Sequence, residues 1–143
     1  MINIKFPKPN FKIKEENGKE LIYDKIRKSW IVLTPEEWVR QNVVEYLVQE
    51  KKYPVTLFAI EKEISVGELK KRFDIVVYKE TMPWLIIECK QMDIALNNQV
   101  ATQVLTYNSS VKAKYICITN GSESFLWEFN SNSISELHEF PNW

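Results

Sequence analysis

The segment FDIVVYKETMPWLIIECK, residues 73–90, decides the fold. It contains two apolar runs rich in β-branched residues, separated by a connection short enough to join neighbouring antiparallel strands. Asp74 lies in the first run, and Glu88 and Lys90 lie at the end of the second. Because side chains alternate between the two faces of a strand, Glu88 and Lys90 share one face. Charges in strands that build a core need either a packing partner or a chemical role.

Length and composition limit the fold and function classes that the chain can have. The chain has 143 residues, of which 45% are hydrophobic and 13% aromatic, so it suits one globular domain with a core. Nineteen basic and nineteen acidic residues balance, which excludes nucleic-acid binding through a net basic charge. Three scattered glycines provide no phosphate loop, which argues against an ATPase motor. Cys89 and Cys117 lack disulfide or zinc spacing and are expected to be reduced core residues.

No apolar stretch approaches the ~18 residues of a membrane span, and the chain does not start with a signal-like apolar region. We therefore expect a cytoplasmic protein without membrane contact. The segment 11–24 predicts an exposed hairpin around Asn17 and Gly18. We interpret residues 1–23 as an N-terminal appendage and residues 24–143 as the main domain.

A helix is predicted to begin at Thr34 and to run to about Glu50. Thr34 suits the N-cap, Pro35 suits the first helical position, and Glu37 is expected to complete a capping box. Three strands follow within residues 56–90, then a second helix over roughly Ile94 to Tyr107, then two more strands. These last strands are KYICITN (114–120) and SFLWEFN (124–130). The order α-β-β-β-α-β-β predicts an α/β fold with a central mixed sheet flanked by helices.

Asp74 can approach Glu88 across the strand pair. Two carboxylates held close repel each other unless a cation joins them, and hard oxygen ligands suit Mg²⁺ or Mn²⁺. Lys90 would then position a water molecule or neutralise charge on a phosphate. The alternative is that all three are strand-end charges facing solvent, with Lys90 as an ion-pair partner.

The pattern Asp74, Glu88-Cys89-Lys90, Gln103-Val-Leu-Thr-Tyr107 resembles the PD-(D/E)xK nuclease superfamily, in particular RecB-type nucleases with a Q-x-x-x-Y element. The phrases TPEEWVRQ, KRFDIVVY, IIECK, QVLTYN and ITNG are similar to the N-terminal domain of type I restriction enzyme R subunits, over about residues 24–127. The resemblance implies a restriction-endonuclease-like core. It also implies metal binding by Asp74, Glu88 and the backbone carbonyl of Cys89, with Lys90 assisting the water.

Gln103 and Tyr107 are four residues apart and share a helix face. The resemblance places this face beside the metal site, whereas the residues alone fit a solvated Gln beside a core Tyr equally well. The superfamily often adds a glutamate from the first helix, for which Glu36 and Glu37 are the candidates. Because Glu37 is expected to serve the capping box, Glu36 is the residue that could reach the site. An ion pair between Glu36 and Arg40 is the alternative.

The resemblance implies a Mg²⁺-dependent DNA nuclease, with Mn²⁺ as a substitute, that acts in restriction or DNA processing. Expected partners are DNA, a second copy of the chain in a homodimer, and restriction-modification subunits. The alternative function is a catalytically inactive module that keeps the nuclease fold and binds nucleic acid or forms complexes. The intact set of Asp, Glu, Lys, Gln and Tyr residues favours the nuclease, whereas the neutral net charge and small size favour this alternative, because a lone domain without net charge binds DNA weakly.

Overall fold

The computed structural model describes the backbone of residues 1–143 and their side chains, apart from those of Val66, Leu69, Val100, Val104, Tyr107, Ser109 and Ser110. Its elements, in chain order, are β1 (Ile13–Glu16), β2 (Lys19–Asp24), β3 (Ser29–Val32), α1 (Pro35–Gln49), the 3-10 turn η1 (Val55–Leu57), β4 (Phe58–Val66), β5 (Leu69–Lys79), β6 (Met82–Cys89), α2 (Asn98–Val111), β7 (Tyr115–Thr119), β8 (Ser124–Asn130) and β9 (Ser133–Leu137). Within the described part of the chain, neither helix is long and apolar enough to span a membrane.

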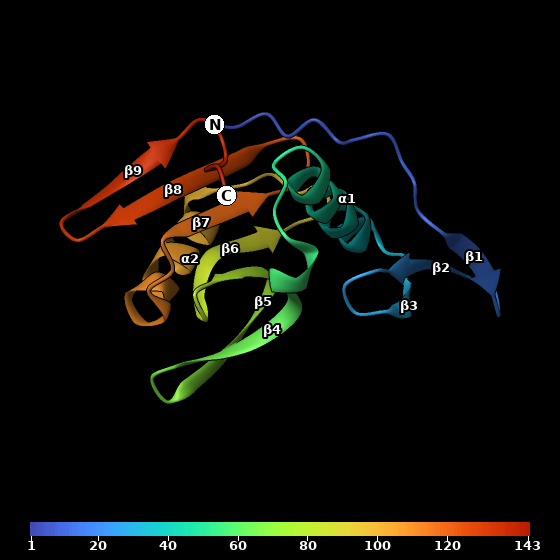
Figure 1. The fold of residues 1–143 in the computed structure, drawn as a ribbon, viewed down its shortest axis with the longest axis horizontal. Helices are drawn as coiled ribbons and strands as arrows, with labels where there is room; N and C mark the ends of the chain where they lie inside the picture. Colours follow the sequence, from blue (N-terminus) through green and yellow to red (C-terminus); the bar gives the residue numbers. More distant parts are fainter.

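Strands β4 to β9 form one sheet in sequence order (Figure 1). Strand β6 pairs with β7 in parallel, and the other neighbours pair antiparallel. The parallel pair requires a crossover, which α2 provides. The predicted mixed sheet with its order of elements is therefore confirmed, and β9 extends it by one strand.

The two faces of this sheet bury two separate apolar clusters. Residues from α1, among them Val39, Val43 and Leu47, pack on the face that carries Ile87 and Cys89. The opposite face carries the cluster Phe73, Val76, Ile86, Val111, Ala113, Ile116 and Ile118, which includes the end of α2. The sheet thus lies between the helices (Figure 1). Cys89 and Cys117 are free and buried, as predicted.

Helix α1 begins as the sequence predicts, with one correction. The Thr34 hydroxyl accepts a hydrogen bond of 3.1 Å from the Glu37 backbone N–H, and Pro35 occupies the first turn. The Glu37 side chain does not serve the predicted capping box. It is 4% exposed and accepts hydrogen bonds from Arg27, Arg40 and Gln41. Two guanidinium groups within reach attract the carboxylate more strongly than one backbone N–H does.

Helix α2 spans Asn98–Val111, so the predicted start at Ile94 and end at Tyr107 are both four residues early. Ile94 lies in the preceding turn, where its carbonyl accepts a hydrogen bond of 2.8 Å from the Asn120 side chain. At the other end, the Asn108 side chain donates to the Ala113 carbonyl and accepts from the Ala113 N–H. Asn120 therefore holds Ile94 in the turn before the helix, and the contacts between Asn108 and Ala113 lie at the end of the helix.

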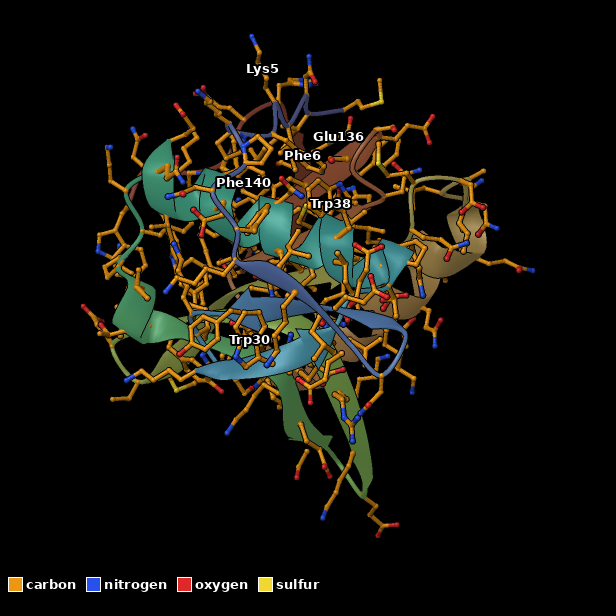
Figure 2. The ribbon with its side chains drawn as sticks, turned by 90° about the vertical axis from the view of Figure 1, so that its right-hand side faces the viewer. Lys5, Phe6, Trp30, Trp38, Glu136 and Phe140 are labelled. Atoms are coloured by element: carbon orange, nitrogen blue, oxygen red, sulfur yellow. The ribbon has the colours of Figure 1, made fainter. Side chains whose placement is uncertain are left out.

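Strands β1 to β3 form a small separate sheet beside α1 (Figures 1 and 2). The hairpin at Asn17 and Gly18 is confirmed, and β3 adds a strand that the sequence did not predict. Phe11, just before β1, packs edge-on against Trp38 of α1 with ring centroids 5.4 Å apart. Ile2 is buried against the main sheet, where its N–H donates to the Ser124 carbonyl. The partition into residues 1–23 and 24–143 stays a prediction.

The two hydrogen bonds between the Asn108 side chain and the Ala113 backbone can be tested by mutation. Asn108→Ala removes two hydrogen bonds from a buried site and should lower the free energy of unfolding by about 1–3 kcal/mol. Urea denaturation followed by circular dichroism measures the change. Asn10→Ala, in the exposed N-terminal segment, is the matched control and should be neutral. Equal stabilities for the two variants would show that these hydrogen bonds do not stabilise the end of α2.

Candidate active site

Asp74 lies where the side-chain alternation of β5 breaks. Phe73 and Val76 pack in the cluster on the α2 face, although they are three residues apart, whereas Ile75 packs in the cluster on the α1 face. On neighbouring β4, Glu61 falls between two paired residues and has a φ of 51°, a left-handed conformation that costs a non-glycine residue energy. Asp74, opposite Glu61, therefore lies at a position where both the pairing of β4 with β5 and the side-chain alternation of β5 are interrupted.

Both oxygens of the Asp74 carboxylate accept hydrogen bonds. Oδ1 accepts from Arg40 Nη2 of α1 at 2.8 Å, and Oδ2 accepts from the Cys89 backbone N–H at the end of β6, also at 2.8 Å. The Asp74 backbone N–H in turn donates to Glu88 Oε1 at 3.3 Å. Asp74 therefore joins three elements, and the structure brings it together with Glu88 and Cys89.

Glu88 is a buried carboxylate, with 9% of its side chain exposed. It shares the α2 face of β6 with Ile86, as alternation predicts. Burial and then the negative charge of Asp74 raise the pKa of Glu88 from 4.5 to about 7, against the opposing effect of Lys71, whose Nζ lies 4.0 Å from Oε2. Such a displaced pKa is typical of functional sites.

A buried charge network supports Asp74 from the side of α1. Arg40 Nη1 donates to Glu37 Oε1 at 2.7 Å, and the same oxygen accepts from Arg27 Nη2 at 2.8 Å. Arg27 is held in the turn after β2 by the buried Asp24. Among the described side chains, Arg40 Nε is a buried nitrogen without a hydrogen-bond partner. Sequence reasoning missed Arg27 and the contact of Arg40 with Asp74, because nothing local connects residues 34 positions apart.

Glu36 and Lys90 are partly buried and interact electrostatically with this cluster. Glu36 Oε1 is 3.6 Å from Arg40 Nη2, so the predicted ion pair is present as a long contact. Burial and then the charge of Asp74 raise the pKa of Glu36, while Arg40 and Lys90 act in the opposite direction. Lys90 also lowers the pKa of Glu88, which places its ammonium within electrostatic reach of both glutamates. The Lys90 backbone N–H donates to the Thr119 carbonyl at 2.8 Å and anchors the end of β6 against β7.

The two residues predicted from α2 are not brought into this cluster by any described contact. The Gln103 side chain is exposed, and among the described residues it makes no hydrogen bond with Asp74 or Glu88. The side chain of Tyr107 lies outside the described residues. The roles of Gln103 and Tyr107 therefore stay predictions.

The donor set fits a divalent cation. Asp74 and Glu88 offer carboxylate oxygens from adjacent strands, and a cation between them would relieve the repulsion that contributes to the raised pKa of Glu88. Among the described residues, no group of three or more His, Cys, Asp and Glu side chains is arranged to hold a metal. Mg²⁺ sites typically use one or two carboxylates together with water and substrate phosphate oxygens.

The sequence matches a known protein family. Residues 35–141 match the family described as "Type I restriction enzyme R protein N terminus (HSDR_N)". The chain belongs to this family. The match begins at the first residue of α1 and ends beyond β9, so the restriction enzyme R N-terminal domain includes every contact of Asp74, whereas Arg27 lies outside it.

One solved structure supports the fold of this R N-terminal domain. It comes from Anabaena variabilis ATCC 29413 and is described as "a putative nuclease belonging to DUF820". The two chains share 13% identity with a TM-score of 0.51, and the alignment covers 88% of this chain and 80% of the other. At this identity the likeness shows a nuclease-like fold. No curated protein matches the chain.

The burial of Glu88 predicts a pH-dependent stability. Because its folded-state pKa of about 7 exceeds the ordinary 4.5, the protonated carboxyl stabilises the fold. This contribution is complete below pH 4.5 and is lost as the pH rises through 7. Glu88→Gln keeps the shape and cannot ionise, so its stability relative to wild type should increase from pH 5 to pH 8. Urea titrations in EDTA measure the difference, with Glu63→Gln, a half-exposed glutamate, as control. A difference that does not vary with pH would contradict the buried titration.

The charge network predicts a large effect of Arg40 on stability. Arg40→Met leaves the buried Glu37 carboxylate short of a partner and should cost about 3–5 kcal/mol. Lys70→Met breaks an exposed pair of 3.8 Å with Glu63 and should change stability by less than about 1 kcal/mol. Comparable losses in both variants would show that Arg40 is not held as described.

Proposed function

We propose that this domain hydrolyses DNA phosphodiester bonds with Mg²⁺, for which Mn²⁺ can substitute. The observation that carries the proposal is the hydrogen bond of 3.3 Å from the Asp74 backbone N–H to the Glu88 carboxylate, which brings a partly buried and a buried acidic residue together on adjacent strands. Lys71 Nζ lies 4.0 Å from Glu88 Oε2, and Lys90 follows Glu88 by two residues, just after β6. The family and the nuclease-like fold support the reaction class. We further propose that the protein acts in the cytoplasm, in a restriction or DNA-processing system with modification or motor subunits, and that it cuts both strands as a homodimer.

Each residue of the cluster has a role in this proposal. Asp74 and Glu88, with the Cys89 carbonyl, would hold the cation, which when bound supplies an activated water and neutralises charge on the phosphate. Arg40 and the Cys89 N–H fix the Asp74 carboxylate, so that it needs little reorganisation when substrate arrives. Lys90 would hold the attacking water or a phosphate oxygen, and Glu36 would accept a proton from that water. Gln103 and Tyr107 would orient DNA at the edge of the site.

One observation favours the inactive module as a second candidate. Both oxygens of Asp74 already accept hydrogen bonds, one of them from a guanidinium group, which is itself a cation in the position next to the carboxylate. A protein in which Arg40 permanently replaces the metal would keep the fold and bind DNA without cutting it. Activity measurements distinguish the two candidates.

Purified wild-type protein should nick or degrade DNA in Mg²⁺ or Mn²⁺ and lose this activity in EDTA. Lys90→Ala should lower turnover by about 10²-fold or more with little change in stability, because Lys90 follows the last residue of β6 and is only partly buried. Asp74→Asn should also raise the metal concentration required, since one anionic ligand is lost. Gel-based cleavage of labelled DNA measures all three proteins.

Lys5→Ala, an exposed lysine in the N-terminal segment, is the matched control for the removal of one surface charge and should cleave like wild type. Activity that persists unchanged in Lys90→Ala would identify a contaminating nuclease. Wild-type protein that binds DNA without cutting it in any of these metals would overturn the catalytic assignment and leave the inactive module.

A further inference from the structure

A row of side chains leads from Glu88 across the α2 face of the sheet. Glu88 is paired with Ile118 on β7, and Ile118 is paired with Phe125 on β8. Paired residues of neighbouring strands point to the same face, and strands lie about 4.8 Å apart. Phe125 is therefore roughly 10 Å from the candidate active site, two strands away along the sheet. Trp127, two residues further on β8, points to the same face.

These two aromatic side chains form one wall of a cavity. The rings of Phe125 and Trp127 are nearly parallel, with an interplanar angle of 15° and centroids 6.2 Å apart, and both side chains are only partly buried. Ile118 of β7 and Leu96, just before α2, also line the cavity. The cavity measures about 240 Å³. This is below the roughly 300–1,000 Å³ of pockets for drug-sized ligands, so it fits a small planar group.

Polar side chains also line the cavity. The Asn98 amide is one of them, and it offers both donors and an acceptor. The Glu136 carboxylate completes the lining from β9, with 41% of its side chain exposed, and lies 3.6 Å from the α-amino group of Met1. Apolar and aromatic walls with a few polar groups at the rim are typical of ligand sites.

We propose that this cavity binds one unpaired nucleobase of the DNA strand whose phosphate lies at Asp74 and Glu88. The identity of the strand rests on the proposed function, whereas the fit of a base to the cavity does not. An aromatic wall stacks any base, and Asn and Glu side chains pair with base edges. Glu136 accepts from the amino group of adenine, cytosine or guanine, a group that thymine lacks. The preferred substrate is then single-stranded or locally unpaired DNA, because a base within a duplex cannot leave the stack without cost.

A thermodynamic cycle between protein and DNA tests this site without hydrolysis. Fluorescence anisotropy in EDTA measures the affinity for a labelled 12-nucleotide single strand of mixed sequence and for an abasic strand with the same phosphates. Wild type should bind the strand with bases about tenfold or more tightly than the abasic strand. Trp127→Leu should remove most of this preference and leave the affinity for the abasic strand unchanged.

Two further variants keep the test decisive. Phe125→Leu should reproduce the loss if Trp127→Leu fails to fold, which circular dichroism would reveal. Trp30→Leu removes an exposed tryptophan from β3, outside the cavity, and should keep the full preference. Equal affinity of wild type for the two strands, absence of measurable binding, or an unchanged preference in both cavity variants would each overturn the proposal.

The result is separable from that of the proposed function. A lost preference in Trp127→Leu together with no cleavage by wild type would retain the nucleobase site and reject the nuclease. Metal-dependent cleavage that requires Lys90, together with an unchanged preference in the cavity variants, would retain the nuclease and reject the nucleobase site.

Discussion

The arrangement of the site depends on how the Asp74 carboxylate is held. Arg40 reaches it from α1 and the Cys89 N–H reaches it from β6, so a single side chain couples the helix on one face to the end of a central strand. A buried carboxylate is tolerated because charged and backbone donors satisfy it. The same arrangement extends through Glu37 and Arg27 to the turn after β2, which ties the small N-terminal sheet to α1. Asp74 lies opposite Glu61, at the position where a pair is missing from the β4–β5 ladder and Glu61 has a left-handed backbone conformation.

The contacts of the buried Glu88 carboxylate do not offset the cost of removing its negative charge from water. Its carboxylate accepts a long hydrogen bond from the Asp74 N–H and has an ammonium 4.0 Å away, which leaves its pKa near 7. Removing a charge from water costs more than these contacts return, and a neighbouring carboxylate adds to the cost. A divalent cation would supply the missing compensation. Stability and proposed activity therefore make opposite demands on Glu88: the fold favours its protonated form, and metal binding requires the ionised one.

Local sequence signals predicted both helices and most of the strands, but not β3, β9 or the ends of α2. Alternation in residues 73–90 and the Thr34 cap predicted β5, β6 and the start of α1, because those patterns act within a few residues. The predicted ends of α2 were wrong: Ile94 is held in the preceding turn by Asn120, and the last turn continues to the contacts between Asn108 and Ala113. The spacing of Asp74 and Glu88 along two adjacent strands predicted their contact, whereas their role and that of Lys90 in a site stay predictions. Arg27 and the contact of Arg40 with Asp74 had no local signal, and Glu37 looked like a cap because its buried partners are not neighbours in sequence.

The central claim is that Asp74 and Glu88 together form a divalent cation site, and a crystal structure grown with Mn²⁺ tests it most directly. The account predicts an anomalous density peak within about 2.0–2.6 Å of one carboxylate oxygen from each residue. Arg40 should either keep its hydrogen bond to Asp74 Oδ1 or move away as the cation takes its place beside that oxygen. A protein saturated with Mn²⁺ that shows no peak between these carboxylates, with the Arg40 and Cys89 contacts to Asp74 unchanged, would contradict the claim.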